Sequence, residues 1–278
     1  MENRQKWIES IKQRISVRTY EEREIEKDDL DKLNRFIDEV NKGMNTKVKF
    51  SIIQNDSSSD QSQKLGTYGI IKGTNTFITA IIQNDEKDVV EIGYFLEKII
   101  LYATGLGLGT CWLGGTFNRK DFENYIALGQ DESLALLIAL GYRKDKQSMI
   151  ETAMRFMAKS DQRKPASELF FEKDSEHSLD LNQLGDYAKV LELVRIAPSA
   201  SNKQPWRIVR NNNNYEFYCC RTPSYGIMNY DLQMNDIGIA KCHFELSALE
   251  LGLKGRWVKQ DNMTSISNFE YVVSWECE

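Results

Sequence analysis

Two arginines flank a serine near the start of the chain, in the order Arg14-x-Ser16-x-Arg18. These polar residues alternate with β-branched ones, so in an extended segment all three project from one face. Two guanidinium groups beside a hydroxyl suit a phosphate or another anion with several acceptor oxygens. A solvated basic strand edge is the alternative, and this segment alone leaves both interpretations open.

A loop in the second half of the chain, APSASNKQPW at 197–206, is the next candidate. Its two prolines and small hydroxyl residues predict a rigid turn that is rich in hydrogen-bond donors. A predicted helix, Asn182–Ile196, precedes the loop, and a predicted strand, Arg207–Arg210, follows it. The corresponding place in the first half, 41–48, lacks both prolines.

The stretch 91–117 positions a third candidate. Its apolar spacing predicts a helix, which Gly105, Gly107 and Gly109 end, and a short buried strand follows at 110–113. The strand breaks at Gly114-Gly115, where backbone N–H groups can approach a flat ligand because no Cβ intervenes. A core helix with a tight turn is the alternative. A dinucleotide fingerprint is excluded, because the helix precedes the glycines.

Part of this stretch occurs twice. Residues 236–257 align without a gap onto 91–112 at an offset of 145, and eight of 22 positions are identical, including one Gly-Leu pair and one Trp. Two such copies predict two pseudo-symmetric halves, 1–172 and 173–278, like a homodimer written as one chain. The copies are unequal, because the second half has neither Arg-x-Ser-x-Arg nor a Gly-Gly after Trp257.

Bulk properties narrow the function. The chain has 278 residues, a net charge of −5 and a pI near 5.4, which argues against nucleic-acid binding. It has no apolar run of membrane length and no signal-peptide core, so we expect no membrane association and a cytoplasmic location. The five cysteines and two histidines do not complete a metal-ligand spacing, so we expect no metal site and few histidine bases.

The remaining pattern predicts alternating helices and strands, and a packing role for Cys111. We expect Lys159 and Lys164, which flank Arg163, to be surface cations. Further helices are predicted at 3–15, 30–40 and 118–125, strands at 47–54, 76–83, 134–141, 215–219 and 268–275, and a polar loop at 55–64.

Four blocks together resemble the flavin-dependent nitroreductase family. They are Arg14-x-Ser16-x-Arg18, APSASNKQPWR at 197–207, GLGLGTCWLGGTF at 105–117, and GYR at 141–143 with RKP at 163–165. Family chains normally carry the APS-type loop before the LGLG helix, whereas here it lies in the second copy. The order therefore resembles the variant branch in which one chain folds like the usual intertwined dimer.

The resemblance implies an α+β sandwich, with helices packed around a mostly antiparallel sheet and FMN at the junction of the two halves. It implies no catalytic side chain, because the flavin N5 performs the chemistry. Arg14, Ser16 and Arg18 would hold the phosphate and the pyrimidine edge, and Arg163 would add a phosphate contact. The other implied FMN contacts are Leu113, Gly114 and Gly115 at N5, Pro198, Ser199, Ala200, Ser201, Asn202 and Gln204 from the second half, and Thr67 and Tyr68 from the loop before the strand at 76–83.

The implied reaction transfers hydride from NAD(P)H, a co-substrate, through FMN to an electron-poor acceptor such as a nitroaromatic or quinone. An arginine near the flavin would stabilise the charge that develops on reduction. We expect one FMN per chain and a monomer that acts as a pseudo-dimer. Reductive dehalogenation, other flavin chemistry and flavin binding without turnover remain alternatives.

Overall fold

A computed structural model describes residues 6–55, 66–84, 88–145, 162–226 and 230–278. The chain divides into two compact units. Compared with the halves expected from the sequence, 6–12, 89–94 and 162–172 belong to the second unit. The polar loop beyond Asn55 and the cation Lys159 lie outside the described residues.

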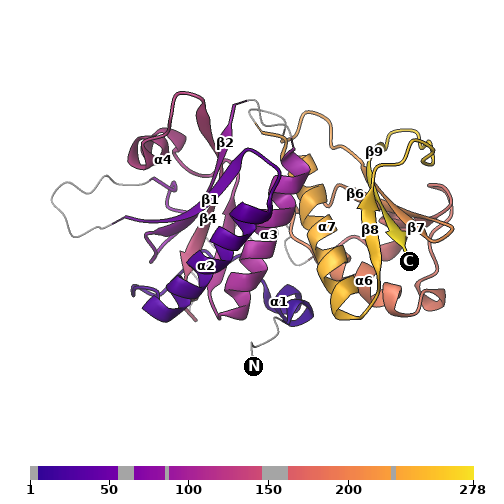
Figure 1. Ribbon diagram of the computed structural model, residues 1–278, viewed down its shortest axis with the longest axis horizontal. Coiled ribbons are helices and arrows are strands. Elements are labelled where there is room, and N and C mark those ends of the chain that lie inside the picture. Colours follow the sequence, from indigo (N-terminus) through magenta and orange to yellow (C-terminus); the bar gives the residue numbers. More distant parts are fainter. Residues whose placement is uncertain (1–5, 56–65, 85–87, 146–161, 227–229) are drawn as a thin grey trace. The chain divides into compact units, whose positions relative to one another are not determined.

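The first unit contains a four-stranded antiparallel sheet in the order β1-β2-β4-β3. Its strands are β1 (Val48–Gln54), β2 (Thr76–Gln83), β3 (Gly109–Leu113) and β4 (Glu132–Gly141), and its helices are α2 (Lys27–Gly43), α3 (Val89–Gly105, from residue 95) and α4 (Arg119–Ile126) (Figure 1).

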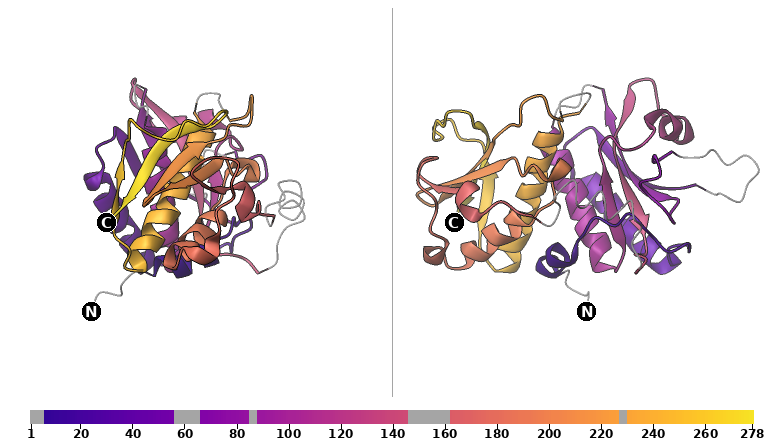
Figure 2. Two further views of the ribbon diagram at one scale, coloured as in Figure 1. Left: turned by 90° about the vertical axis from the view of Figure 1, so that its right-hand side faces the viewer. Right: turned by 180° about the vertical axis from the view of Figure 1, so that it is seen from behind.

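Helices α3 and α4 cover opposite faces of this sheet (Figure 2). On one face, Cys111 and Leu113 of β3 pack with Phe122 of α4 in a buried apolar cluster. On the other face, Trp112 Nε1 donates a hydrogen bond of 3.0 Å to Glu97 of α3. Alternation along β3 therefore sends neighbouring side chains to different helices, and Cys111 lies in the core, where its packing role was expected.

The segment that carries Arg14, Ser16 and Arg18 runs beside β3. Ser16 forms a parallel bridge with Thr110, and the Val17 N–H donates to the Thr110 carbonyl at 2.8 Å. The approach requires glycine at 109, since a Cβ there would lie 2.9 Å from the Val17 side chain. The extended conformation predicted for this segment is thus present at Ser16 and Val17.

The second unit contains a five-stranded sheet in the order β5-β6-β7-β9-β8, in which β5 and β6 are parallel and the other pairs antiparallel. Helix α7 lies against β6 and β7, and α6 packs beside α7 (Figure 2). The elements are α1 (Trp7–Gln13, up to residue 12), β5 (Phe170–Glu172), α6 (Asp186–Arg195), β6 (Trp206–Asn211), β7 (Asn214–Cys219), α7 (Leu232–Glu250), β8 (Gly255–Val258) and β9 (Glu270–Cys277).

The two units share one topology. The succession α2-β1-β2-α3-β3-β4, apart from α4, matches α6-β6-β7-α7-β8-β9, and the strand orders β1-β2-β4-β3 and β6-β7-β9-β8 correspond. The repeated glycines end their helices in the same way. Gly107 has a φ of 82° and Gly252 one of 79°. In each copy the next residue donates back five positions to close the last turn, to Ala103 and to Ala248.

The structure confirms the α+β class with mostly antiparallel pairing and corrects several element bounds, among them α2, which covers Lys27–Gly43 rather than 30–40. The first helix covers Trp7–Gln13 rather than 3–15, of which 3–5 lie outside the described residues. Helix α6 begins at Asp186 rather than 182, because Gly185 adopts a φ of 56° and a 3-10 turn precedes it. The last strand is Glu270–Cys277 rather than 268–275, since Asn268 has a φ of 68°.

Within the second unit, the first turns of α3 and α7 pass close together at two repeated glycines. A Cβ on Gly93 would lie 2.2 Å from the Asn235 carbonyl oxygen, and one on Gly238 would lie 2.0 Å from that of Val90. Positions 93 and 238 correspond in the repeat, and 90 and 235 are related by the same offset of 145, so the contact is reciprocal, as in a two-fold symmetric helix pair.

No helix in the described parts of the chain combines the length and apolar character needed to span a membrane.

We predict that Gly93→Ala destabilises the protein by about 3 kcal/mol or more, because the methyl group meets a backbone carbonyl that cannot move without the helix. Urea unfolding measures the loss. Gly43→Ala is the matched control. Gly43 ends α2 with no atom within 4 Å of the added Cβ, and the change should be neutral or stabilise by up to about 1 kcal/mol. Equal effects of the two substitutions would contradict the close crossing.

Candidate functional site

Arg14 is a nearly buried cation in the first unit, with 8% of its surface exposed. Its Nε lies 3.6 Å from Oε1 of Glu97, a carboxylate that is fully buried. That distance is too long for a hydrogen bond, and Nε has no hydrogen-bond partner among the described residues. Burial lowers the pKa of Arg14 and Glu97 opposes the shift, but a guanidinium stays charged.

Arg18 is half-buried, and its Nε and Nη1 are buried without a hydrogen-bond partner in the described parts of the chain. A buried donor that lacks an acceptor costs about 1–3 kcal/mol, and more when it is charged. Two guanidinium groups of one short segment are therefore short of acceptors, with the half-buried Ser16 between them in sequence. A multi-acceptor anion such as a phosphate would relieve both.

The glycine pair follows β3 in the same unit. Leu113 is 1% exposed and its side chain packs in the core, so this residue can reach a ligand only through its backbone. Gly115 is exposed, with open space where a Cβ would be. Thr67 is buried and its hydroxyl donates to the Ile71 carbonyl at 3.4 Å, whereas Tyr68 is 70% exposed with a φ of 50°.

In the second unit, the proline-bracketed turn is rigidly held. Ser201, Asn202 and Gln204 all have φ near 50°, a region that costs non-glycine residues about 1 kcal/mol or more each. The Ser199 hydroxyl accepts from the Gln204 N–H at 2.9 Å. Both carboxylate oxygens of the buried Asp236 on α7 accept from the Ala200 N–H, at 3.0 and 3.2 Å. These bonds maintain a strained but ordered loop.

Arg163 joins the same turn. Its Nη1 donates to the Asn202 side chain at 2.8 Å and its Nη2 to the Ile196 carbonyl at 3.2 Å. The Lys164 N–H donates to Gln204 Oε1 at 2.8 Å. The structure therefore brings Arg163 together with the candidate residues of 198–204, and part of its guanidinium is already engaged by protein acceptors.

Each unit thus holds one group of candidate residues. The first unit holds Arg14, Ser16, Arg18, Thr67, Tyr68, Leu113, Gly114 and Gly115, and the second holds Arg163, Pro198, Ser199, Ala200, Ser201, Asn202 and Gln204.

Sequence reasoning missed two residues around these groups. Glu97 and Asp236 are buried acids on α3 and α7, and only the placement of their partners reveals them. Lys164, which was expected to be a surface cation, is half-buried, and this burial, together with the charges of Arg207 and Lys203, lowers its pKa.

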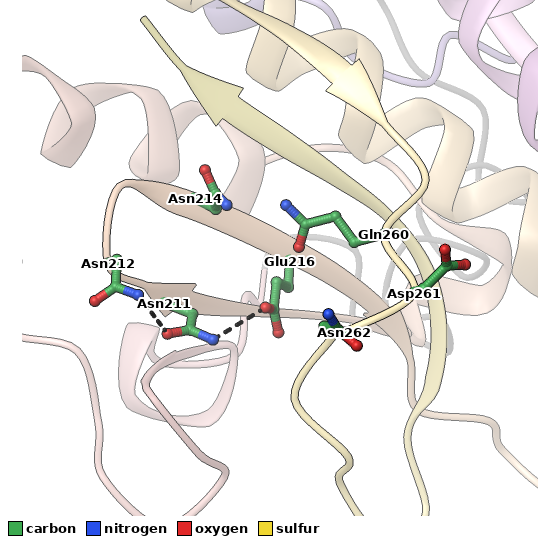
Figure 3. A pocket seen from close by; sticks show the side chains of 7 residues that line it. All are labelled: Asn211, Asn212, Asn214, Glu216, Gln260, Asp261 and Asn262. Carbon is green, nitrogen blue, oxygen red and sulfur yellow. Dashed lines mark hydrogen bonds between the residues drawn. The ribbon is translucent and has the colours of Figure 1, made fainter.

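A polar cavity of about 390 Å³ lies elsewhere in the second unit, at the β6–β7 hairpin (Figure 3). Its lining has two carboxylates and no lysine or arginine, so it does not suit a phosphate. The lining residues are Asn211, Asn212, Asn214, Glu216, Gln260, Asp261 and Asn262. No cluster of three or more His, Cys, Asp or Glu that could hold a metal occurs among the described residues.

Comparison with known proteins identifies a family model that matches most of the chain. The family model that matches residues 6–248 is described as "Putative TM nitroreductase". A crystal structure of a putative nitroreductase from Thermotoga maritima matches with 20% identity and a TM-score of 0.59, over 99% of this chain and 95% of that one. At this identity the match shows a shared fold.

Two further structures match about half of the chain. An FMN-dependent nitroreductase from Clostridium difficile has 22% identity and a TM-score of 0.38, over 50% of this chain and 88% of its own. A nitroreductase with bound FMN from Bacteroides fragilis has 19% identity and a TM-score of 0.39, over 52% and 91%. No curated protein matches the sequence.

We predict that Asp236→Ala releases the turn, because the Ala200 N–H loses a buried, charged acceptor. The expected loss of stability is about 1–3 kcal/mol, with faster hydrogen exchange at Ala200. Glu250→Ala is the control, since that exposed carboxylate on the same helix also accepts a backbone N–H, from Ile8 at 3.0 Å. A loss at Glu250 as large as that at Asp236 would show that burial of the acceptor is unimportant.

Proposed function

The chain belongs to the nitroreductase family whose model covers residues 6–248, as its sequence motifs predicted, and on this premise we propose that it is an FMN-dependent oxidoreductase. The proposed reaction passes hydride from NAD(P)H to an electron-poor acceptor such as a nitroaromatic or a quinone. We also propose that the protein is a cytoplasmic monomer that binds one FMN per chain. One observation carries the cofactor assignment: the buried guanidinium atoms of Arg18 that have no acceptor among the described residues.

The chemistry of these residues fits the phosphate end of FMN. Arg14 and Arg18 come from one extended segment, and both are short of hydrogen-bond acceptors. A phosphate dianion supplies three acceptor oxygens and two negative charges, which can compensate two guanidinium groups. We therefore assign Arg14, Ser16 and Arg18 to the phosphate.

The other candidates fit the flat part of such a cofactor. Gly114 and Gly115 carry no side chain that would keep a flat ligand away from their backbone N–H groups. At Gly115 the space that a Cβ would occupy is open. FMN, when bound, supplies the hydride chemistry at its N5. The protein's own part is then to bind and orient both reactants, which needs no histidine base.

We further propose that FMN binding requires the turn of the second unit. Its strained backbone is already held by Asp236, Ser199 and Arg163 before any ligand binds. Preorganisation of this kind reduces the entropy lost on binding. An internal duplication with unequal copies would account for one FMN per chain, since the arginine segment occurs only in the first unit and the proline-bracketed turn only in the second.

Titration of the purified protein with FMN, followed by anaerobic mixing with NADH and NADPH, tests the function. We expect one FMN per chain, bleaching of the flavin by at least one nucleotide, and recovery of the colour with a nitroaromatic or quinone. Failure to bind FMN would refute the cofactor assignment. Tight binding without reduction by either nucleotide would leave a flavin-binding protein that is not an oxidoreductase of this kind.

We predict that Arg18→Gln weakens FMN binding by about 10- to 100-fold, because a hydrogen bond to a charged group contributes about 1.5–3 kcal/mol. Fluorescence titration measures the Kd. Arg35→Gln removes an exposed charge from α2 in the same unit and should change the Kd less than about twofold. Equal losses from both variants would indicate that only net charge matters.

A further inference from the structure

We propose that Glu97 is an internal counter-ion of Arg14 that holds this guanidinium when no ligand is bound and limits the affinity of the site for phosphate. The residue is fully buried on α3, and its Oε1 lies 3.6 Å from Arg14 Nε. The role rests on the proposed function in one respect, namely that Arg14 binds the phosphate of FMN.

The interaction leaves Arg14 available to a ligand. At a separation of 3.6 Å the two groups form an ion pair without a hydrogen bond, and Arg14 Nε has no hydrogen-bond partner among the described residues. A bidentate arginine–carboxylate pair would use two donors and fix the guanidinium in place. Glu97 therefore compensates the charge of Arg14 without consuming the donors that a phosphate needs.

Glu97 also accepts a hydrogen bond of 3.0 Å from Trp112 Nε1. Binding Trp112 is therefore an alternative reason for a glutamate at position 97. The repeated copy provides an answer. Trp257, the equivalent of Trp112, donates at 2.7 Å to Glu245, which corresponds to position 100 of the first copy rather than to 97. A tryptophan at this place can thus be satisfied from one helical turn further along.

In the first copy, position 100 is the buried Ile100, and the acceptor stands at 97, where it also lies beside Arg14. The second copy has no Arg-x-Ser-x-Arg segment, and its residue equivalent to Glu97 is Cys242. The acid at position 97 therefore accompanies the arginine segment, whereas a tryptophan acceptor is present in both copies.

Removal of the Glu97 charge should have opposite effects on the two states of the protein. Without ligand, Arg14 would lose the negative charge of its ion-pair partner, and an uncompensated buried charge is strongly destabilising. With a phosphate bound, the like-charge repulsion between carboxylate and phosphate would disappear, and the ligand would bind more tightly. A merely structural glutamate would lower stability without raising anion affinity.

Glu97→Gln is the test, since the amide keeps an oxygen acceptor for Trp112. We expect the FMN-free protein to melt about 5 °C or more lower than the unmodified protein. We expect the Kd for FMN, from fluorescence titration, and for inorganic phosphate, from thermal-shift titration, each to fall by about 10-fold. An unchanged or higher phosphate Kd in a folded Glu97→Gln protein would overturn the inference.

Two variants separate charge from hydrogen bonding. Trp112→Phe removes the donor but keeps the Glu97 charge, so the phosphate Kd should not fall. Glu245→Gln makes the same chemical change beside Trp257 and should lower stability without tightening phosphate binding. A tenfold gain in either variant would also overturn the inference, because the gain would then not come from the charge at position 97.

The phosphate titration keeps this inference distinct from the proposed function. If the unmodified protein binds no FMN but Glu97→Gln still tightens phosphate, the flavin assignment fails and the counter-ion role stands. If FMN binds the unmodified protein and Glu97→Gln tightens neither ligand, the function stands and the counter-ion role fails.

Discussion

A nearly buried guanidinium must have negative charge close by, and this constraint governs the first unit. Parallel pairing of the segment around Ser16 with β3 brings Arg14 into the interior, where it forms an ion pair with Glu97 of α3. Strand β3 also directs Trp112 toward Glu97 on one face of the sheet and places Cys111 and Leu113 in the apolar cluster on the other face. The site and the packing of both sheet faces therefore depend on the short edge strand β3.

In the second unit the main constraint is that the strained turn at 198–204 must be kept in one conformation. Three residues with positive φ would relax if the loop stood alone. Asp236 and Ser199 accept its backbone N–H groups, and Arg163 donates to Asn202. Charge compensation in one unit and backbone restraint in the other are separate ways to hold polar groups in place, and both would preorganise the proposed FMN contacts.

Local signals in the sequence predicted much of the fold. Glycines at the end of α3, alternation around Ser16 and prolines around the turn each act over a few residues, so the pattern identified them. The assignment of 6–12 and 89–94 to the second unit depends on contacts across more than a hundred positions, which periodicity does not encode. Glu97 and Asp236 were missed for the same reason, because a buried acid is explained only by a partner distant in sequence.

Because the two units share one topology, comparing the two copies shows which features the fold itself requires. Features found in both copies, such as the glycine stops and a tryptophan bonded to a helix glutamate, are demands of the architecture itself. Features found in only one copy are not required by the fold, so they could change for a specialised role. Substitutions of the shared features would then impair maturation of the polypeptide, whereas substitutions of the unshared ones would yield well-folded protein with altered chemistry.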